Sequence, residues 1–397
     1  MITEKTILNL LDRKNMFFEE DYNANEGLIE NKIKNSKIIV IGGAGSIGSS
    51  AVKLLLNYEP LLLHIIDINE NKLVELVRYV RSSIGYTKGV FETFPIDVGS
   101  KTFEAFINSN EGYDVWLNFS ALKHVRSERD PFTLMRMLEV NFENTYKMLK
   151  IAKNTGAKEF FSVSTDKACD PVNFLGASKR LMEFALSCFS KELKTSSARF
   201  GNVAFSDGSL LFSALNRLEN LQPLVAPVDI KRYFITHEEA AKLSLMATFC
   251  SQASEIYVPK IKKSEAQKDF PSIIEKLLRF KGYKMHITKS ESEARLIAKN
   301  RNSDSWPCYL FNTDTSGEKD EEVFLGVEDL LIENSYKEIE VINTENLINE
   351  DKLRLLLNNL NKIKENKLNG EEIKKLIKKN IKNFNHNDKP KSLEEKM

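Results

Sequence analysis

The chain has 397 residues, 42% of them hydrophobic, and its 57 lysine and arginine residues nearly balance its 56 aspartate and glutamate residues. This composition predicts a folded globular protein with one large or two ordinary domains and excludes a disordered chain. The balanced charge gives no reason to expect nucleic acid as a partner. No apolar run approaches the roughly 20 residues that a membrane-spanning helix needs, and the first residues lack a signal-peptide plan. We therefore expect a cytoplasmic protein without an integral membrane segment.

A helical lead-in is predicted over residues 1–35, where a short amphipathic helix from Thr3 to Leu11 precedes an acidic, Asn-rich stretch. The pattern then changes, because Lys37–Ile41 is a short β-rich apolar run followed directly by a glycine-rich loop. Helical periodicity follows over Ser50–Leu56, and a second apolar run ends in Asp67. This order of strand, glycine turn, helix, strand and acid is typical of a dinucleotide-binding βαβ unit.

The glycine-rich loop reads Gly42-Gly43-Ala44-Gly45-Ser46-Ile47-Gly48. Gly42 or Gly43 would make the tight turn, and Gly45 would let the backbone approach a pyrophosphate. Gly48 would let the helix lie close to the sheet, while the first helical turn, at Ser46 and Ile47, would offer free N–H groups to phosphates. An ordinary glycine-rich turn is the alternative, which the flanking strand, helix and acid disfavour.

Asp67 indicates which dinucleotide is expected. Its carboxylate can accept hydrogen bonds from ribose hydroxyls, and its charge would repel a 2′-phosphate. No lysine or arginine follows it before Lys72. The sequence therefore favours NAD, with NADP possible.

Apolar runs continue to alternate with helical segments. Strands are expected over 90–94, 114–120 and 159–163, and a long helix is expected from Pro131 to Gly156. This alternation predicts an α/β fold, a doubly wound parallel sheet of the Rossmann type with right-handed crossovers. Further residues expected at the cofactor edge of this sheet are Asp97, Val98, Ser120, Ala121 and Lys123.

The stretch from Ser164 to Lys179 follows the strand at 159–163 and runs into a helix predicted over Lys179–Phe189. It places the hydroxyl of Thr165, the carboxylate of Asp166 and the ammonium of Lys167 where a strand ends. Open α/β sheets carry their chemistry at this edge. A solvated Asp-Lys pair at a strand end is the alternative interpretation.

The second half of the chain is predicted to complete the fold. Thr236 and Glu239 have capping-box spacing at the start of a helix, and a further helix is expected over Ile273–Phe280. We expect one domain over residues 36–335, with a smaller C-terminal substrate-binding subdomain mainly from 200–335. Residues 340–397 are expected to form a basic helical extension with a disordered tail after about Asn383, which packs on the sheet domain, on a second subunit or only against solvent.

The four cysteines and the histidines predict no metal site. The cysteines lie far apart, without a CxxC pair or a neighbouring histidine, at positions 169, 188, 250 and 308. No histidine has ligand spacing. We therefore expect reduced thiols and no metal.

Eight motifs together resemble the nucleotide-sugar 4,6-dehydratases of the capsular-polysaccharide type, within the extended short-chain dehydrogenase/reductase (SDR) family. In chain order they are Gly42–Gly48, Ile66–Glu70, Ser120–Val125, Ser164–Ala168, Gly176–Arg180, Arg199–Val203, Arg232–Thr236 and Ser316–Lys319. The resemblance implies a hydro-lyase in modified-sugar biosynthesis for polysaccharides. It also implies a nucleotide-sugar substrate such as UDP-N-acetylglucosamine, a tightly held nicotinamide cofactor and a homo-oligomer.

Site roles carried over by the resemblance start with the central stretch. Thr165 would hydrogen-bond the sugar 4-oxygen, Asp166 would assist loss of the 6-hydroxyl, and Lys167 would remove the C5 proton. Lys179 would hold the nicotinamide ribose. Substrate-binding positions implied by the resemblance are Lys123, Asn173, Arg199, Asn202, Ser209 and Arg232. An ordinary ion pair with a helix carboxylate is the alternative for either arginine.

Leu175 departs from the usual site of this fold, which carries a tyrosine four residues before the lysine. Leucine cannot carry a proton, so one role at the 4-hydroxyl is lost. The membrane-anchored members of the resembled family carry methionine at this position, which implies that Asp166 or a water takes this proton. Two other functions stay open: epimerisation, redox chemistry or isomerisation of a sugar nucleotide or sugar phosphate by the same fold, and a catalytically decayed dinucleotide-binding sensor or scaffold.

Overall fold

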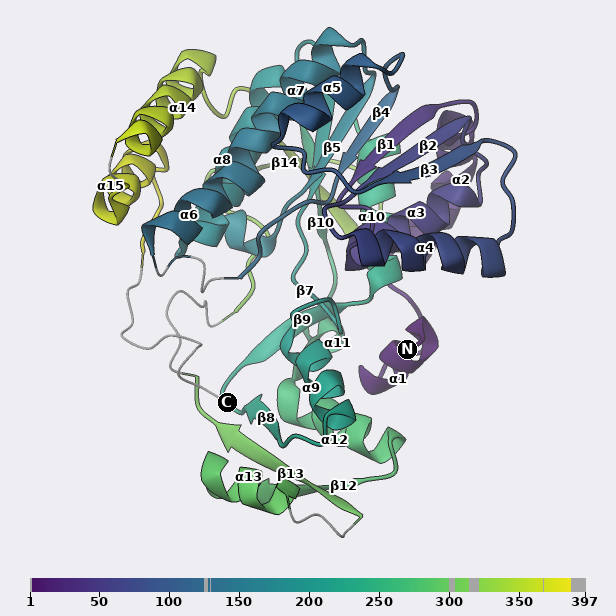
Figure 1. Cartoon of the computed structure of the whole chain (residues 1–397), viewed down its shortest axis with the longest axis vertical. Helices are drawn as coiled ribbons and strands as arrows, with labels where there is room; N and C mark the ends of the chain where they lie inside the picture. The colour runs from purple at the N-terminus through teal and green to yellow at the C-terminus, as the bar shows by residue number, and fades with distance from the viewer. Residues whose placement is uncertain are drawn as a thin grey trace.

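A nine-stranded sheet forms the centre of the larger part of the molecule (Figure 1). The computed structural model describes residues 2–124, 128, 130–299, 304–313, 321–366 and 368–386. The strand order is β14-β15-β10-β6-β5-β4-β1-β2-β3. The strands are β1 (Lys37–Ile41), β2 (Leu62–Ile66), β3 (Val90–Phe94), β4 (Val115–Asn118), β5 (Glu159–Val163), β6 (Lys194–Ala198), β10 (Glu255–Pro259), β14 (Leu330–Ile332) and β15 (Ile339–Asn343).

The sheet is parallel from β3 through β10, and β15 and β14 extend it in antiparallel pairing. The strand order reverses between β1 and β4, which is the topological switch point where such sheets bind ligands. The predicted doubly wound α/β fold is confirmed.

Helices cover both faces of the sheet, because alternate residues of each strand are apolar on opposite sides. Ile38 and Val40 of β1 face one core, with α2 (Glu19–Ile33), α3 (Ser46–Leu56), α4 (Glu70–Ser83) and α10 (His237–Phe249). Ile39 and Ile41 face the other. The helices of that second core are α5 (Lys101–Asn108), α6 (Pro131–Leu138), α7 (Asn144–Asn154) and α8 (Phe174–Phe189).

Among the helices that differ from their predicted bounds are the one after β4 and the one after β5. The helix expected from Pro131 to Gly156 is interrupted by a π-helical turn, η2 (Glu139–Glu143), between α6 and α7. Helix α8 begins at Phe174, five residues before the predicted start, because the Asn173 side chain caps it by accepting the Gly176 N–H at 2.7 Å. The Thr236–Glu239 capping box of α10 is confirmed.

The smaller part lies below the sheet in Figure 1 and has a core of its own. One small sheet contains β7 (Asn202–Val203), β9 (Lys231–Ile235) and β11 (Gln267–Asp269), and the other contains β8 (Leu224–Pro227), β13 (Ser305–Phe311) and β12 (Lys284–Thr288). Its helices are α9 (Leu210–Glu219), α11 (Lys263–Ala266), α12 (Phe270–Phe280) and α13 (Glu291–Lys299). The first helix, α1 (Glu4–Leu10), packs against α12. Residues 200–335 therefore divide between both parts, since α10 and β10 return to the large sheet.

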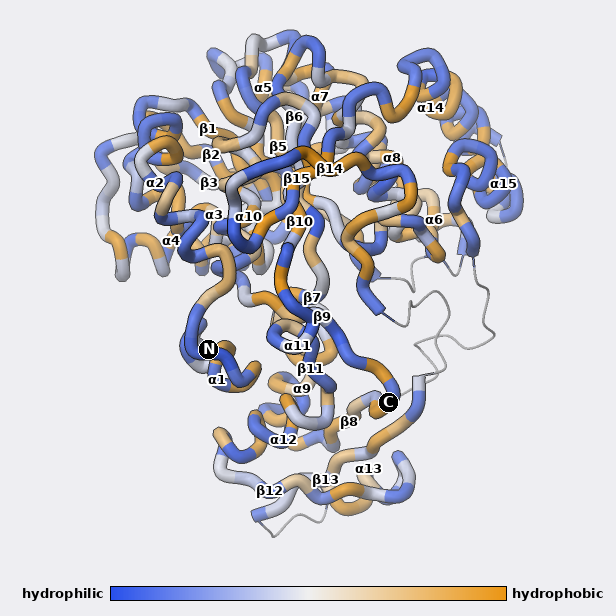
Figure 2. The backbone as a smooth tube through the Cα atoms, turned by 180° about the vertical axis from the view of Figure 1, so that it is seen from behind, coloured by the Kyte–Doolittle hydropathy of each residue, from blue (hydrophilic) through white to orange (hydrophobic). Residues whose placement is uncertain are grey.

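The basic C-terminal extension folds onto the sheet domain. Its helices, α14 (Glu350–Glu365) and α15 (Gly370–Asn380), alternate hydrophilic and hydrophobic residues along their length (Figure 2). Leu353, Leu356 and Ile377 are buried in the core that contains α6, α7 and α8. No helix within the described ranges is long and apolar enough to cross a bilayer. The Ser316–Lys319 motif and the tail after residue 386 lie outside the described residues.

Candidate active site

The glycine loop after β1 is closed so tightly that side chains cannot enter it. Gly42 has φ +71°, and a Cβ there would lie 2.6 Å from the Ser120 nitrogen. A Cβ on Gly48 would lie 2.3 Å from the Gly42 carbonyl oxygen. Gly42, rather than Gly43, therefore makes the left-handed turn, and Gly48 allows α3 to approach it. With Gly45 at its N-cap, α3 opens without a side-chain cap, which leaves backbone N–H groups that fit a pyrophosphate.

Asp67 stands at the end of β2, beside this loop. Its Oδ2 accepts the Ala44 N–H at 3.1 Å, and its Oδ1 accepts the Asn69 N–H at 2.9 Å. Lys72, the next cation in the chain, pairs with Asp207 at 2.6 Å. The carboxylate thus lies against the glycine loop, and the ammonium of Lys72 is already paired with Asp207.

Asp207 belongs to a turn of the smaller part that reaches the glycine loop. Its backbone N–H donates to Ser46 Oγ at 2.8 Å. Next to it, Ser206 Oγ accepts a hydrogen bond from Lys123 Nζ at 3.3 Å. Burial lowers the pKa of Lys123, an effect that the charge of Asp207 opposes. These contacts connect the smaller part to the predicted cofactor edge.

The loop after β4 is held by two asparagines. Ser120 donates from its N–H and Oγ to Asn118 Oδ1 at 3.1 and 2.7 Å. Asn141, in the π-helical turn, accepts the Leu122 N–H and donates to the Leu122 carbonyl, both at 2.9 Å. Asn141 also donates to Ser178 Oγ of α8, so the π-helical turn connects the loop after β4 with α8. Of the other predicted cofactor residues, Ile47, Val98 and Ala121 are partly buried, and Asp97 pairs with Arg136 at 3.2 Å.

Thr165, Asp166 and Lys167 form one hydrogen-bonded chain at the end of β5. Thr165 Oγ1 donates to Asp166 Oδ1 at 2.7 Å, and Lys167 Nζ donates to the same oxygen at 3.2 Å. The Asp166 side chain is 3% exposed, whereas that of Lys167 is 30% exposed. A short 3₁₀ turn, η3 (Asp166–Ala168), holds the three residues against α8. The chain links a hydroxyl, a carboxylate and an ammonium, which are groups that can move protons along one path.

Lys179 lies behind this chain on the second turn of α8. Its Nζ donates to the Val163 carbonyl at 2.9 Å, and the side chain is buried. Burial lowers the pKa of Lys179 to about 7, although the Glu183 carboxylate partly opposes this effect. The site therefore contains an amine that titrates near neutral pH.

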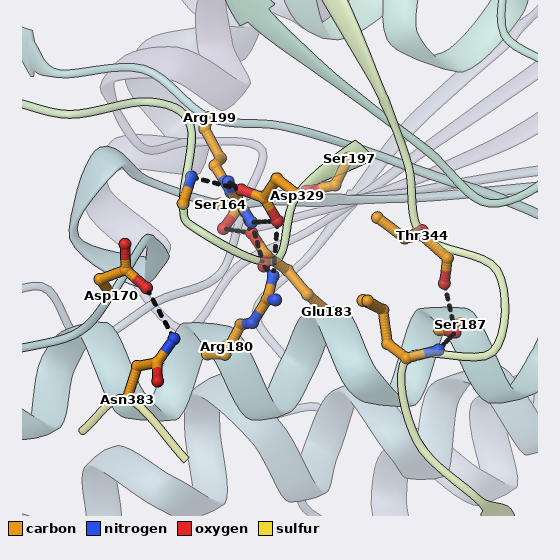
Figure 3. Close-up of polar contacts among 12 residues, drawn as sticks. Ser164, Asp170, Arg180, Glu183, Ser187, Ser197, Arg199, Asp329, Thr344 and Asn383 are labelled. Carbon is orange, nitrogen blue, oxygen red and sulfur yellow. Dashed lines mark hydrogen bonds and ion pairs between the residues drawn. The ribbon is translucent and has the colours of Figure 1, made fainter. Parts of the chain in front are cut away.

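Leu175 is buried at the first turn of α8, with its N–H donating to Glu128 Oε1 at 2.9 Å. The other oxygen of Glu128 lies 3.4 Å from His386 Nε2. The C-terminal segment thereby reaches the start of α8, and Asn383 donates to Asp170 in the same region (Figure 3).

Apart from Lys123, which contacts Ser206, the predicted substrate residues divide into three groups. Asn202 and Arg232 meet at one carboxylate, since Glu322 Oε1 accepts from Asn202 Nδ2 at 2.8 Å and lies 3.6 Å from Arg232 Nε. Asn173 and Ser209 use their side-chain oxygens to cap α8 and α9. Arg199 forms the third group alone.

Arg199 is fully buried in an ion network beside α8 (Figure 3). Its Nε and Nη2 donate to Glu183 at 2.7 Å each, and its remaining N–H groups reach Asp329 and the Phe324 carbonyl. Every guanidinium N–H is therefore used within the protein, and none is left for a diphosphate. The geometry favours the ion-pair interpretation, so Arg199 has no part in the substrate site proposed below.

Three residues of the site have no counterpart among the sequence predictions: Asn141, Asp207 and Glu322. An asparagine in the middle of a predicted helix is a weak helix former, which could have indicated the π-helical turn at Asn141. The other two carry no local signal, because their partners are distant in the sequence.

Comparison with known proteins gives one family. A family model described as "Polysaccharide biosynthesis protein" matches residues 38–300. The chain is 32% identical to an uncharacterized membrane protein of Methanocaldococcus jannaschii, MJ1061, over 278 residues, covering 68% of this chain and 79% of that protein.

Two bacterial relatives carry more specific names. The capsular polysaccharide biosynthesis protein CapD of Staphylococcus aureus is 31% identical over 58% of this chain, and the match spans only 39% of CapD. A UDP-N-acetylglucosamine 4,6-dehydratase (inverting) of Campylobacter jejuni is 29% identical over 56% of this chain and 66% of its own length. Among solved structures, Pen from Bacillus thuringiensis superposes with a TM-score of 0.60 at 19% identity, covering 79% of this chain and 87% of Pen. That likeness shows that this chain and Pen share a fold.

Proposed function

The chain belongs to the polysaccharide biosynthesis protein family, and from that premise we propose that it is a nucleotide-sugar 4,6-dehydratase. Its substrate is UDP-N-acetylglucosamine or a similar nucleoside-diphosphate hexose. The observation that carries the proposal is the hydrogen-bonded chain of Thr165, Asp166 and Lys167 at the end of β5. Dehydration across C5 and C6 needs a base and an acid next to each other. The hydrogen-bonded residues Thr165, Asp166 and Lys167 offer both.

The residues around the switch point fit NAD. The glycine loop and the open N-terminus of α3 suit the pyrophosphate, and Asp67 suits the ribose. In this proposal Lys179, buried beside the end of β5, holds the nicotinamide ribose. The chemistry that bound NAD supplies is oxidation of the sugar at C4 and reduction at C6.

This chain's own residues then move the protons. Thr165 hydrogen-bonds the 4-oxygen and relays its proton to Asp166, to which it already donates. This route replaces the phenol that Leu175 lacks. Once C4 is a ketone, the C5 proton is acidic, and Lys167 removes it after its ammonium proton has passed to solvent. A carboxyl group protonates the 6-hydroxyl, which leaves as water. Asn202 and Arg232 hold the diphosphate after Glu322 yields its contacts with them.

The test is incubation of the purified protein with UDP-N-acetylglucosamine, followed by mass spectrometry and NMR of the product. Loss of one water with a 4-keto, 6-deoxy sugar supports the proposal. An isomer of unchanged mass would instead assign epimerisation. Cofactor binding without turnover of any nucleotide sugar in a panel would indicate a non-catalytic dinucleotide-binding protein.

A further inference from the structure

Glu322 is a buried carboxyl group that contacts Asn202 and Arg232, the two proposed diphosphate ligands. It is 8% exposed and lies beside Gly201, where Asn202 and Arg232 contact its Oε1. Its Oε2 is buried and has no hydrogen-bond partner. Burying an ionised carboxylate with one oxygen unpaired raises the free energy of the folded protein. A protonated carboxyl group carries no charge that burial must desolvate.

The charged groups that face Glu322 come from two elements. Burial raises the pKa of Glu322, and the negative charge of Asp166 in η3 raises it further. The positive charges of Arg232 in β9 and Lys167 in η3 oppose these two effects, but the pKa of Glu322 stays above its usual value. Asp166 has the contrasting environment, because its Oδ1 accepts hydrogen bonds from Thr165 and Lys167. Such bonds stabilise an ionised carboxylate.

Both carboxyl groups lie next to residues 200–201, because the Asp166 N–H donates to the Phe200 carbonyl and Glu322 lies beside Gly201. We propose that Asp166 and Glu322 together carry one proton in the resting enzyme, with Asp166 ionised and Glu322 protonated. Two carboxyl groups in contrasting environments commonly divide into a base and an acid. The inference rests on the proposed function for its catalytic meaning, since it assigns Glu322 as the acid for the 6-hydroxyl. It also relieves Asp166 of serving both the 4-hydroxyl and the 6-hydroxyl.

The proton count balances over the cycle. The 4-hydroxyl proton passes through Thr165 to Asp166 as C4 is oxidised. Lys167, whose side chain is 30% exposed, gives its ammonium proton to solvent and then takes the C5 proton as a neutral amine. The C6–O bond breaks with its electron pair, and Glu322 gives its proton to the departing hydroxyl, which leaves as water. Lys167 returns its proton to C5 as C6 is reduced. Asp166 finally gives its proton to water and Glu322 takes one from water, so that the two groups again carry one proton.

The activity test compares Glu322→Gln with Glu321→Gln, a matched change at the preceding residue. The Glu321 side chain is 56% exposed and pairs with Lys263 at the surface. With UDP-N-acetylglucosamine, we expect Glu322→Gln to retain the absorbance rise of the reduced cofactor and the exchange of the C5 hydrogen in deuterium oxide. Loss of water should fall by about 10²- to 10⁴-fold, as for removal of a general acid. Glu321→Gln should behave as the wild type. Dehydration by Glu322→Gln at the wild-type rate, or an equal loss of all three signals, would overturn the assignment.

A second measurement needs no substrate. Infrared spectra of the protein without nucleotide sugar at neutral pH should show the carbonyl stretch of a protonated carboxyl group that Glu322→Gln removes and Glu321→Gln keeps. Absence of that difference overturns the pair, whatever the substrate is. If the band is present but the wild type removes no water from any nucleotide sugar, the proposed dehydratase function fails while the protonated pair stands.

Discussion

Replacement of Gly176 by alanine should disable the site while leaving the fold largely intact. A Cβ at this position would lie 2.0 Å from the Lys167 carbonyl oxygen and 2.8 Å from its carbon, and real Cβ contacts are not closer than 3.0 Å. The first turn of α8 and the turn at Lys167 must therefore separate by about 1 Å, since both atoms belong to the backbone. Such overpacking costs about 1–3 kcal/mol, of which the better helix propensity of alanine offsets about 1 kcal/mol.

The net loss of stability should thus be about 0–2 kcal/mol, whereas a 1 Å displacement of catalytic groups can cost about 100-fold in rate. Urea unfolding and the rate of water loss from UDP-N-acetylglucosamine measure the two effects separately. Gly27→Ala is the control, because Gly27 lies in α2 and a Cβ there meets nothing within 4 Å. That variant should gain about 0.5–1 kcal/mol and keep full activity. Wild-type turnover in Gly176→Ala would refute the reasoning that the close contact of α8 positions Lys167.

Three further changes test other parts of the structure. Lys167→Ala should abolish dehydration but retain cofactor reduction on mixing with the nucleotide sugar, as followed by absorbance; undiminished dehydration would contradict its role as the C5 base. Arg199→Met should lower the free energy of unfolding by about 3–5 kcal/mol, because it leaves the buried carboxylates of Glu183 and Asp329 with Arg180 as their one shared cation. A change below about 1 kcal/mol in urea melts would remove the structural assignment. Lys179 has a pKa lowered to about 7 by burial, so the unfolded chain binds more protons above that pH. Wild-type stability should therefore rise between about pH 7 and 10 relative to Lys179→Met, and equal pH slopes in the two proteins would contradict this linkage.

The local pattern of the chain predicted most of the large sheet. Continuous apolar runs at 37–41 and 159–163 became β1 and β5 with the predicted bounds, because both faces of a covered parallel sheet are buried. The glycine spacing predicted the closed turn before α3, since only glycine tolerates those contacts. The antiparallel strands β14 and β15 were not predicted. They lie in a polar part of the chain and join the sheet only through pairing with β10.

The sequence by itself determined the dinucleotide-type βαβ unit, the order of hydroxyl, carboxylate and ammonium after β5, and the lack of a phenol at Leu175. These features depend on neighbours within a few residues, where periodicity and steric rules act. Only the tertiary structure decided which partners the buried polar and charged side chains have. Arg199 meets Asp329 across 130 positions and Asn202 meets Glu322 across 120, so no local pattern distinguishes a phosphate ligand from a buried ion pair. Folding removes these groups from water, and their partners in the buried site then set their charge and chemistry.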